Sequence, residues 1–109
     1  MEENIEKLKF PIGKYKAILE FNFSRTVEDI KTLESFSQKL NDAVKGLDKT
    51  DLKKTYRDGG MNIAQIIHHY CDTHTYAFIR TKHTLLEDNP SVKMYEVSEF
   101  LTTPESNVL

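Results

Sequence analysis

The sequence predicts an all-α domain built on two long amphipathic helices, at about residues 26–46 and 62–87. Three observations support this fold class. Apolar residues recur every three or four positions through both segments, which is the spacing of one helix face. Gly46 follows the first segment and Asn89-Pro90 the second, as helix-stopping residues do. The length of 109 residues fits one small core, so we expect a single domain over residues 1–109.

Residues 1–23 are expected to form an extended arm. They lack sustained helical spacing, and Phe10-Pro11-Ile12-Gly13 joins a proline, whose ring fixes φ, to a glycine that tolerates a turn.

The first long helix is predicted to begin near Thr26. Thr26 and Asp29, three residues apart, resemble a capping box. The apolar positions that follow are Val27, Ile30, Leu33, Phe36, Leu40, Val44 and Leu47. A polar connection with one short helical turn around Asp51–Lys54 is expected before the second helix.

The second long helix is the better defined of the two. Asn62, directly after the Asp58-Gly59-Gly60-Met61 loop, is a plausible N-cap, and the helix should end near Glu87 because Asn89-Pro90 cannot continue it. Residues 88–109 are predicted to be a loop or tail with at most a short helix near Ser98–Leu101.

Both predicted helices carry apolar stripes wider than one antiparallel partner can cover. The arm, the tail or a second copy of the chain must cover the remainder, and a homodimer is expected.

The composition excludes several classes of function. Fifteen basic residues against seventeen acidic ones give a net charge of -2, which provides no basic surface for nucleic acid or an anionic membrane. The charged start of the chain and its lack of a long apolar run predict a cytoplasmic protein. The single cysteine, Cys71, allows no intramolecular disulfide and is expected to be a small buried apolar residue.

The second helix carries four histidines that are divided between its faces. Its polar line comprises Asn62, Gln65, His69, Asp72 or Thr73, Tyr76, Arg80 and His83. Ligands on one helix reach a common metal best at a spacing of three or four, but His69 and His74 are five apart. His69 and His83 share the line but lie roughly 21 Å apart along the axis. This helix can therefore donate at most one ligand.

The spacing leaves two interpretations of the polar line open. It could be a solvated helix face, or it could line a polar pocket within a helical bundle. His74, in the apolar stripe, is expected to be a hydrogen-bonded core histidine. Arg80 could be a surface arginine or a ligand for an anion.

Three separated motifs resemble the YfiT-like branch of the DinB superfamily, which includes metal-dependent hydrolases and bacillithiol S-transferases. They are FPIGKYK, YRDGGMNIAQIIHHYCDTH and AFIRTKHTLLEDNPSVKMYE, in the order and spacing of the family. The resemblance implies the N-terminal half of an up-and-down four-helix bundle, truncated after the second bundle helix. Met61 replaces the tryptophan usual after Gly-Gly in that family.

The resemblance also implies a site. Three histidines hold zinc or nickel in the family, and the second histidine of the His-His pair corresponds to His69. The other two come from a late helix that has no counterpart in this sequence, so the implied site is incomplete. Tyr76 and Arg80 are candidates to bind an anionic substrate, and a low-molecular-weight thiol is a candidate nucleophile.

Two further interpretations remain beside the enzymatic one. The chain could be a non-catalytic truncated paralogue that acts as a helical dimerisation or interaction module, alone or with a full-length paralogue. It could also be a fragment of a longer reading frame.

Overall fold

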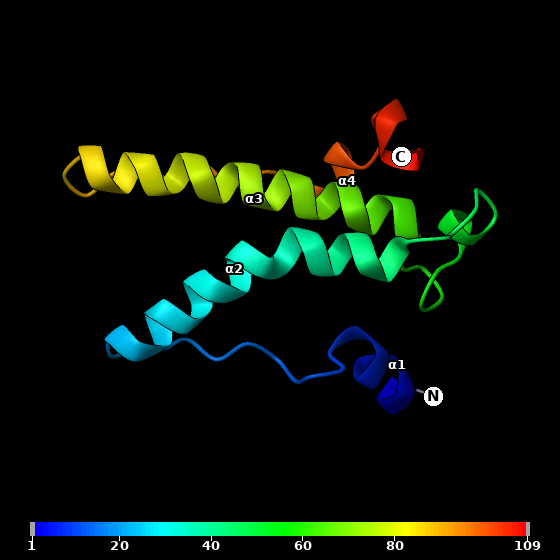
Figure 1. Ribbon diagram of the computed structural model, residues 1–109, viewed down its shortest axis with the longest axis horizontal. Helices are drawn as coiled ribbons and strands as arrows, with labels where there is room; N and C mark the ends of the chain where they lie inside the picture. The colour runs from blue at the N-terminus through cyan, green and yellow to red at the C-terminus, as the bar shows by residue number, and fades with distance from the viewer. Residues whose placement is uncertain (1, 109) are drawn as a thin grey trace. The chain divides into compact units, whose positions relative to one another are not determined.

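The protein is described by a computed structural model that places the backbone of residues 2–108 (Figure 1). Over this range it contains four α-helices, two 3₁₀-helices and no strand, so the all-α prediction is confirmed. The chain forms two compact units, residues 1–47 and 48–109, which are described separately. The expectation of a single domain stays a prediction.

The first unit contains α1 (Glu2–Lys9) and α2 (Phe23–Val44), joined by a non-helical segment. The prediction of an arm extended throughout residues 1–23 is wrong, because α1 occupies its beginning. Glu, Lys and Leu are good helix formers, and they fill this short stretch. The helix then ends before Pro11 and Gly13, whose φ of 88° suits a residue without a side chain.

Helix α2 begins three residues before the predicted start at Thr26. The Asn22 side chain caps it by accepting a hydrogen bond of 3.0 Å from the Arg25 backbone N–H. Its apolar face is open, with Ile30 58% and Leu33 61% exposed. This agrees with the expectation that the two long helices leave apolar surface uncovered.

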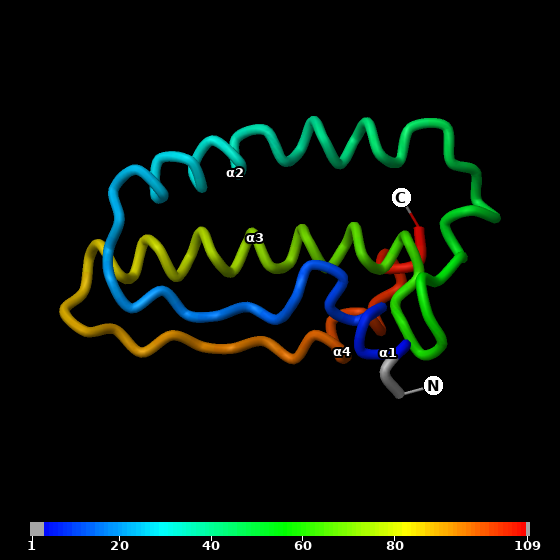
Figure 2. Tube along the Cα trace, turned by 90° about the horizontal axis from the view of Figure 1, so that it is seen from below, coloured from blue at the N-terminus to red at the C-terminus, as the bar shows by residue number. Residues whose placement is uncertain are grey.

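The second unit contains η1 (Asp51–Lys53), α3 (Ile63–Leu86), α4 (Val97–Phe100) and η2 (Pro104–Asn107). The turn predicted around Asp51–Lys54 is present as η1. After α3 the chain reverses at Asn89, which has a φ of 49°, and then runs back alongside α3 (Figure 2). Both η1 and η2 contact α3. The loop or tail predicted for residues 88–109 therefore includes the expected short helix and packs on α3.

The fully buried part of this unit lies at the beginning of α3. Ala64 is 1% exposed, and Ser106 of η2 is 2% exposed. The Ser106 hydroxyl donates to the Phe100 carbonyl at 3.2 Å, which satisfies the buried polar group. The two buried residues thus belong to α3 and η2, two elements that contact each other.

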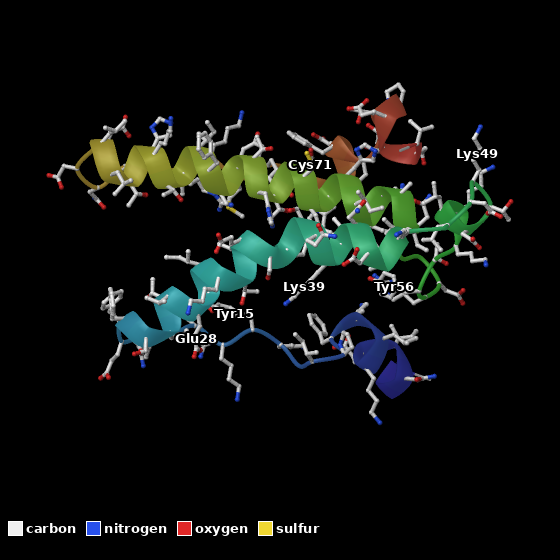
Figure 3. All side chains as sticks on the ribbon, in the orientation of Figure 1. Tyr15, Glu28, Lys39, Lys49, Tyr56 and Cys71 are labelled. Atoms are coloured by element: carbon white, nitrogen blue, oxygen red, sulfur yellow. The ribbon has the colours of Figure 1, made fainter. Side chains whose placement is uncertain are left out.

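Beyond its first two turns, the side of α3 opposite His69 and Thr73 is open, which corrects two predictions. Cys71, labelled in Figure 3, and His74 are exposed, so neither is a core residue in this structure. Cys71 lies about 200° around the helix from His69 and from Thr73, the side that the returning chain covers. Farther along α3, Phe78 is 58% exposed. None of the described helices has the length and apolar character needed to cross a membrane.

Asn62 caps α3 as the sequence predicts. Its side chain accepts the Gln65 N–H at 2.8 Å, and the Gln65 side chain accepts the Asn62 N–H at 3.0 Å. This reciprocal capping box satisfies two backbone donors at the helix end.

Replacing Asn62 with alanine should lower the free energy of unfolding by about 1 kcal/mol, because the Gln65 backbone N–H loses the side-chain oxygen that accepts its hydrogen bond. Urea unfolding followed by circular dichroism would measure the loss. Asn62→Ser keeps a capping oxygen and should stay within a few tenths of a kcal/mol of the wild type. Equal losses in the two variants would show that the cap does not contribute.

Candidate functional site

His69 lies on α3 within a short hydrogen-bonded chain of side chains. The Tyr95 hydroxyl is 3.2 Å from His69 Nδ1 and 2.7 Å from the Thr73 hydroxyl. All three residues are partly buried. Because His69 and Thr73 are one helical turn apart, a single tyrosine from the returning chain contacts both.

An aromatic cluster of Tyr76, Tyr95 and Phe100 holds this tyrosine in place. The ring of Tyr95 stacks on Tyr76 with centroids 4.6 Å apart and contacts Phe100 at 4.8 Å. Tyr76 and Phe100 also meet edge to face at 5.8 Å. Aromatic pairs of this kind each contribute about 0.5–1.5 kcal/mol beyond their buried area. The hydroxyl next to His69 is thus carried by a ring with little freedom to move.

The structure gives the other histidines of α3 different surroundings. His68 Nε2 donates to the Val108 carbonyl at 2.6 Å. His83 Nδ1 is 3.3 Å from the Glu87 carboxylate near the end of the helix. His74 is exposed. The three do not converge with His69, in agreement with the spacing argument.

A hollow of about 420 Å³ lies beside His68 and is separate from the Tyr95 contact. It is lined by His68, Asp72, Glu99, Phe100, Thr103, Glu105 and Ser106. Hydrogen bonds from the backbone N–H of Glu105 itself and from the Thr103 side chain, helped by His68, lower the pKa of the Glu105 carboxyl below its ordinary 4.5. Most of these contacts lie within η2 and its N-cap residue, and only His68 belongs to α3.

The predicted substrate residues lie on the same side of α3 as His69. Tyr76 and Arg80 are partly buried, and the Arg80 Nε–H donates to the Tyr76 carbonyl at 3.4 Å. Arg80 lines an open pocket of about 450 Å³ together with Val92. Helical rise places Arg80 roughly 16 Å from His69 along the axis. From His69 to Arg80 the polar line is thus not a fully solvated face. The roles of Tyr76 and Arg80 in substrate binding stay predictions.

His69 fits the role of a single metal ligand. A histidine ligand binds the metal through one ring nitrogen while the other is hydrogen-bonded, and here Nδ1 has Tyr95 as its partner. However, no group of three or more His, Cys, Asp or Glu residues that could hold a metal ion occurs within the part of the chain that the structure describes. The described residues therefore offer one ligand and do not form a complete site.

Several known proteins are similar to this chain over nearly its whole length. Two relatives, whose names begin "Putative metal-dependent hydrolase", come from Geobacillus thermodenitrificans and Geobacillus kaustophilus; they are 37% and 34% identical over 105 residues. Each alignment covers 96% of this chain and 59% of the relative. YfiT from Bacillus subtilis, a four-helix bundle of unusual topology, matches with a TM-score of 0.88 and 31% identity. Over the part that it spans, the chain is YfiT-like in both sequence and fold.

The extent of the YfiT-like match limits what it transfers. The structural match covers 94% of this chain and 58% of YfiT, so the chain spans less than two thirds of the relatives to which it is similar. No family model matches the chain. The predicted fold class, part of a YfiT-like four-helix bundle, is confirmed. The relatives' names describe metal-dependent hydrolases, and these names refer to the full-length relatives.

The sequence offered His69 as a candidate metal ligand, but it did not point to the side chain that hydrogen-bonds to it. Tyr95 lies 26 residues away in a segment that the sequence predicts to be loop, so no periodicity relates the two side chains. A signal was nevertheless present, because Tyr95 belongs to the VKMYE stretch of the third family motif. A tyrosine inside a motif that lacks regular structure deserved consideration as a site residue.

Proposed function

We propose that this chain supplies the His69 ligand, with its hydrogen-bonding partners, to the divalent-metal site of a hydrolase or a thiol S-transferase. The observation that carries the proposal is the contact between His69 Nδ1 and the Tyr95 hydroxyl at 3.2 Å. It engages one ring nitrogen from within the fold and leaves Nε2 for a metal ion. The relatives' names support the metal dependence.

A bound zinc or nickel ion would lower the pKa of a coordinated water or thiol toward neutrality. The chain's own residues would orient the substrate. Arg80, partly buried and lining an open pocket, is suited to pair with a carboxylate or phosphate. Its separation from His69 of roughly 16 Å favours an extended anionic molecule, such as a low-molecular-weight thiol of the bacillithiol type. The cytoplasmic location stays a prediction.

The remaining ligands must come from outside the described residues. A complex with a full-length YfiT-like paralogue would supply them, whereas a homodimer would add only a second copy of His69. The open apolar faces support either assembly. Ile30 and Leu33 on α2 and Phe78 and Leu85 on α3 are all more than half exposed. Exposed apolar patches of this kind are typical of protein interfaces.

Mass measurement in solution tests the assembly directly. Light scattering coupled to size-exclusion chromatography should give a dimer or larger species at micromolar concentration, because apolar side chains on both units need cover. Replacing Leu33 with glutamate places a charge on the open face of α2, and Leu85→Glu does the same on α3. At least one variant should dissociate, whereas a wild-type monomer would contradict the proposal.

A non-catalytic interaction module is the second candidate function, supported by the same open faces and by the lack of a complete ligand set among the described residues. Elemental analysis of protein purified alone and with a co-expressed full-length paralogue separates the two. The metal proposal expects zinc or nickel to co-purify with at least one preparation and to be lost from its His69→Ala form. Less than about 0.1 equivalent in both preparations, or a content unchanged by His69→Ala, supports the module instead.

A further inference from the structure

We propose that Tyr95 is a positioning residue that holds the His69 ring with its proton on Nδ1 and the Nε2 lone pair free. The hydrogen bonds of Tyr95 do not depend on metal binding, but the role given to them here rests on the proposed metal-binding function of His69. The hydrogen-bonded chain of His69, Tyr95 and Thr73 carries the inference, and nothing in the relatives' names refers to it.

Either hydroxyl of the Tyr95–Thr73 pair could be the donor, and we infer the direction from the two distances and from the acidity of the hydroxyls. The 2.7 Å between the Tyr95 and Thr73 hydroxyls matches the usual O–H···O length, whereas 3.2 Å to His69 Nδ1 is at the long end of the N–H···O range. A phenol is a stronger acid than an aliphatic alcohol, so Tyr95 is the better donor of the hydroxyl pair. Tyr95 therefore donates to Thr73 and accepts the Nδ1–H of His69.

The direction of the hydrogen bond between Tyr95 and His69 determines which ring nitrogen of His69 carries the proton. An unconstrained neutral histidine in water prefers to carry its proton on Nε2, where a metal would have to bind. A hydroxyl that accepts from Nδ1–H reverses this preference, because the hydrogen bond made by one nitrogen sets the state of the other. His69 is then prepared for coordination before any metal arrives.

The surroundings of Tyr95 explain why it can impose this state. Its ring contacts both Tyr76 and Phe100, so the hydroxyl returns to the same place without the entropy cost of ordering a free side chain. Thr73 is available to Tyr95, whereas the hydroxyls of Thr75, Thr81 and Thr84 donate to carbonyls four residues earlier on α3. The Thr73 hydroxyl thus fixes the rotation of the Tyr95 O–H.

Nitrogen NMR of the histidine rings tests the assignment without metal. In alkaline buffer, the ring of His69 should give the nitrogen signals of the Nδ1–H form. Tyr95→Phe keeps the aromatic ring and removes the hydroxyl, so His69 should revert to the Nε2–H form. Thr73→Val should do the same, since Tyr95 loses its acceptor and turns its proton onto Nδ1. Tyr15→Phe makes the same chemical change at a side chain that is 84% exposed and should leave His69 as in the wild type.

Metal affinity provides the second measurement. In whichever preparation binds metal through His69, competition titration with zinc should show Tyr95→Phe weakening affinity about 10–100-fold, with Tyr15→Phe unchanged. Wild-type His69 in the Nε2–H form, or equal zinc affinity in wild type and Tyr95→Phe, overturns the positioning role while leaving the metal proposal intact. If no preparation binds zinc through His69, the metal proposal fails, and the NMR result alone decides the role of Tyr95.

Discussion

Replacing Tyr95 with alanine is expected to destabilise the second unit by about 2–4 kcal/mol, the largest stability effect expected for any substitution in the returning segment. The variant removes the stack on Tyr76 at 4.6 Å, the contact with Phe100 at 4.8 Å and the hydrogen bonds to His69 and Thr73. The estimate lies below the full cost of a buried aromatic residue because Tyr95 is only partly buried.

Hydrogen exchange would locate this loss as well as measure it. Amides of α4 and η2, and those at the beginning of α3, should exchange faster in Tyr95→Ala, because the returning chain is no longer anchored. Tyr15→Ala deletes a tyrosine of the first unit that is 84% exposed (labelled in Figure 3) and should change the unfolding free energy by less than about 0.5 kcal/mol. Similar losses in both variants would contradict the anchoring role.

The pair Tyr95→Ala and Tyr95→Phe separates packing from hydrogen bonding at one position. Phenylalanine retains the contacts with Tyr76 and Phe100 and should keep most of the stability. The hydroxyl therefore matters mainly for the state of His69, and the ring mainly for the attachment of residues 91–108 to α3. A site built this way uses a stable aromatic cluster to orient a polar group.

Local signals predicted α3 well. The cap residue Asn62 and the stop at Asn89-Pro90 are strong signals, and the observed helix, Ile63–Leu86, lies within the predicted range of 62–87. The start of α2 was less certain because Asn22 and Thr26 are both acceptable caps, and the structure uses Asn22. Helix α1 was missed because it is short and ends just before the Phe10-Pro11 turn signal.

Burial was harder to predict than secondary structure. Helical periodicity separates the polar line of α3 from its apolar stripe. Hydropathy alone would then place the apolar stripe in the core. In the structure the returning chain covers the polar side near His69 instead, and it leaves Cys71 and His74 exposed. Which side is covered depends on contacts such as Tyr95 to Thr73, between residues distant in sequence, and these leave no trace in the periodicity.

Replacing His69 with alanine is expected to weaken zinc or nickel binding more than any other single change in this chain. Loss of a second-layer hydrogen bond costs about 10–100-fold in affinity, and loss of the ligand itself should exceed that, with more than about 100-fold weaker binding. Isothermal or competition titration of the metal-binding preparation would measure it. The imidazole is only partly buried, so the fold should tolerate the substitution.

His83→Ala provides the matched control for this prediction. His83 lies on the same polar line of α3 and pairs with Glu87. It is roughly 21 Å from His69 along the helix axis, which is too far for the two histidines to share a metal. Its loss should change metal affinity less than twofold, at the level of other surface substitutions. The metal proposal thus requires an order of effects in which His69→Ala exceeds Tyr95→Phe, and Tyr95→Phe exceeds His83→Ala. If His83→Ala reduced affinity as much as His69→Ala, the bound metal would depend on surface histidines in general, and the contact between His69 and Tyr95 would have no special role.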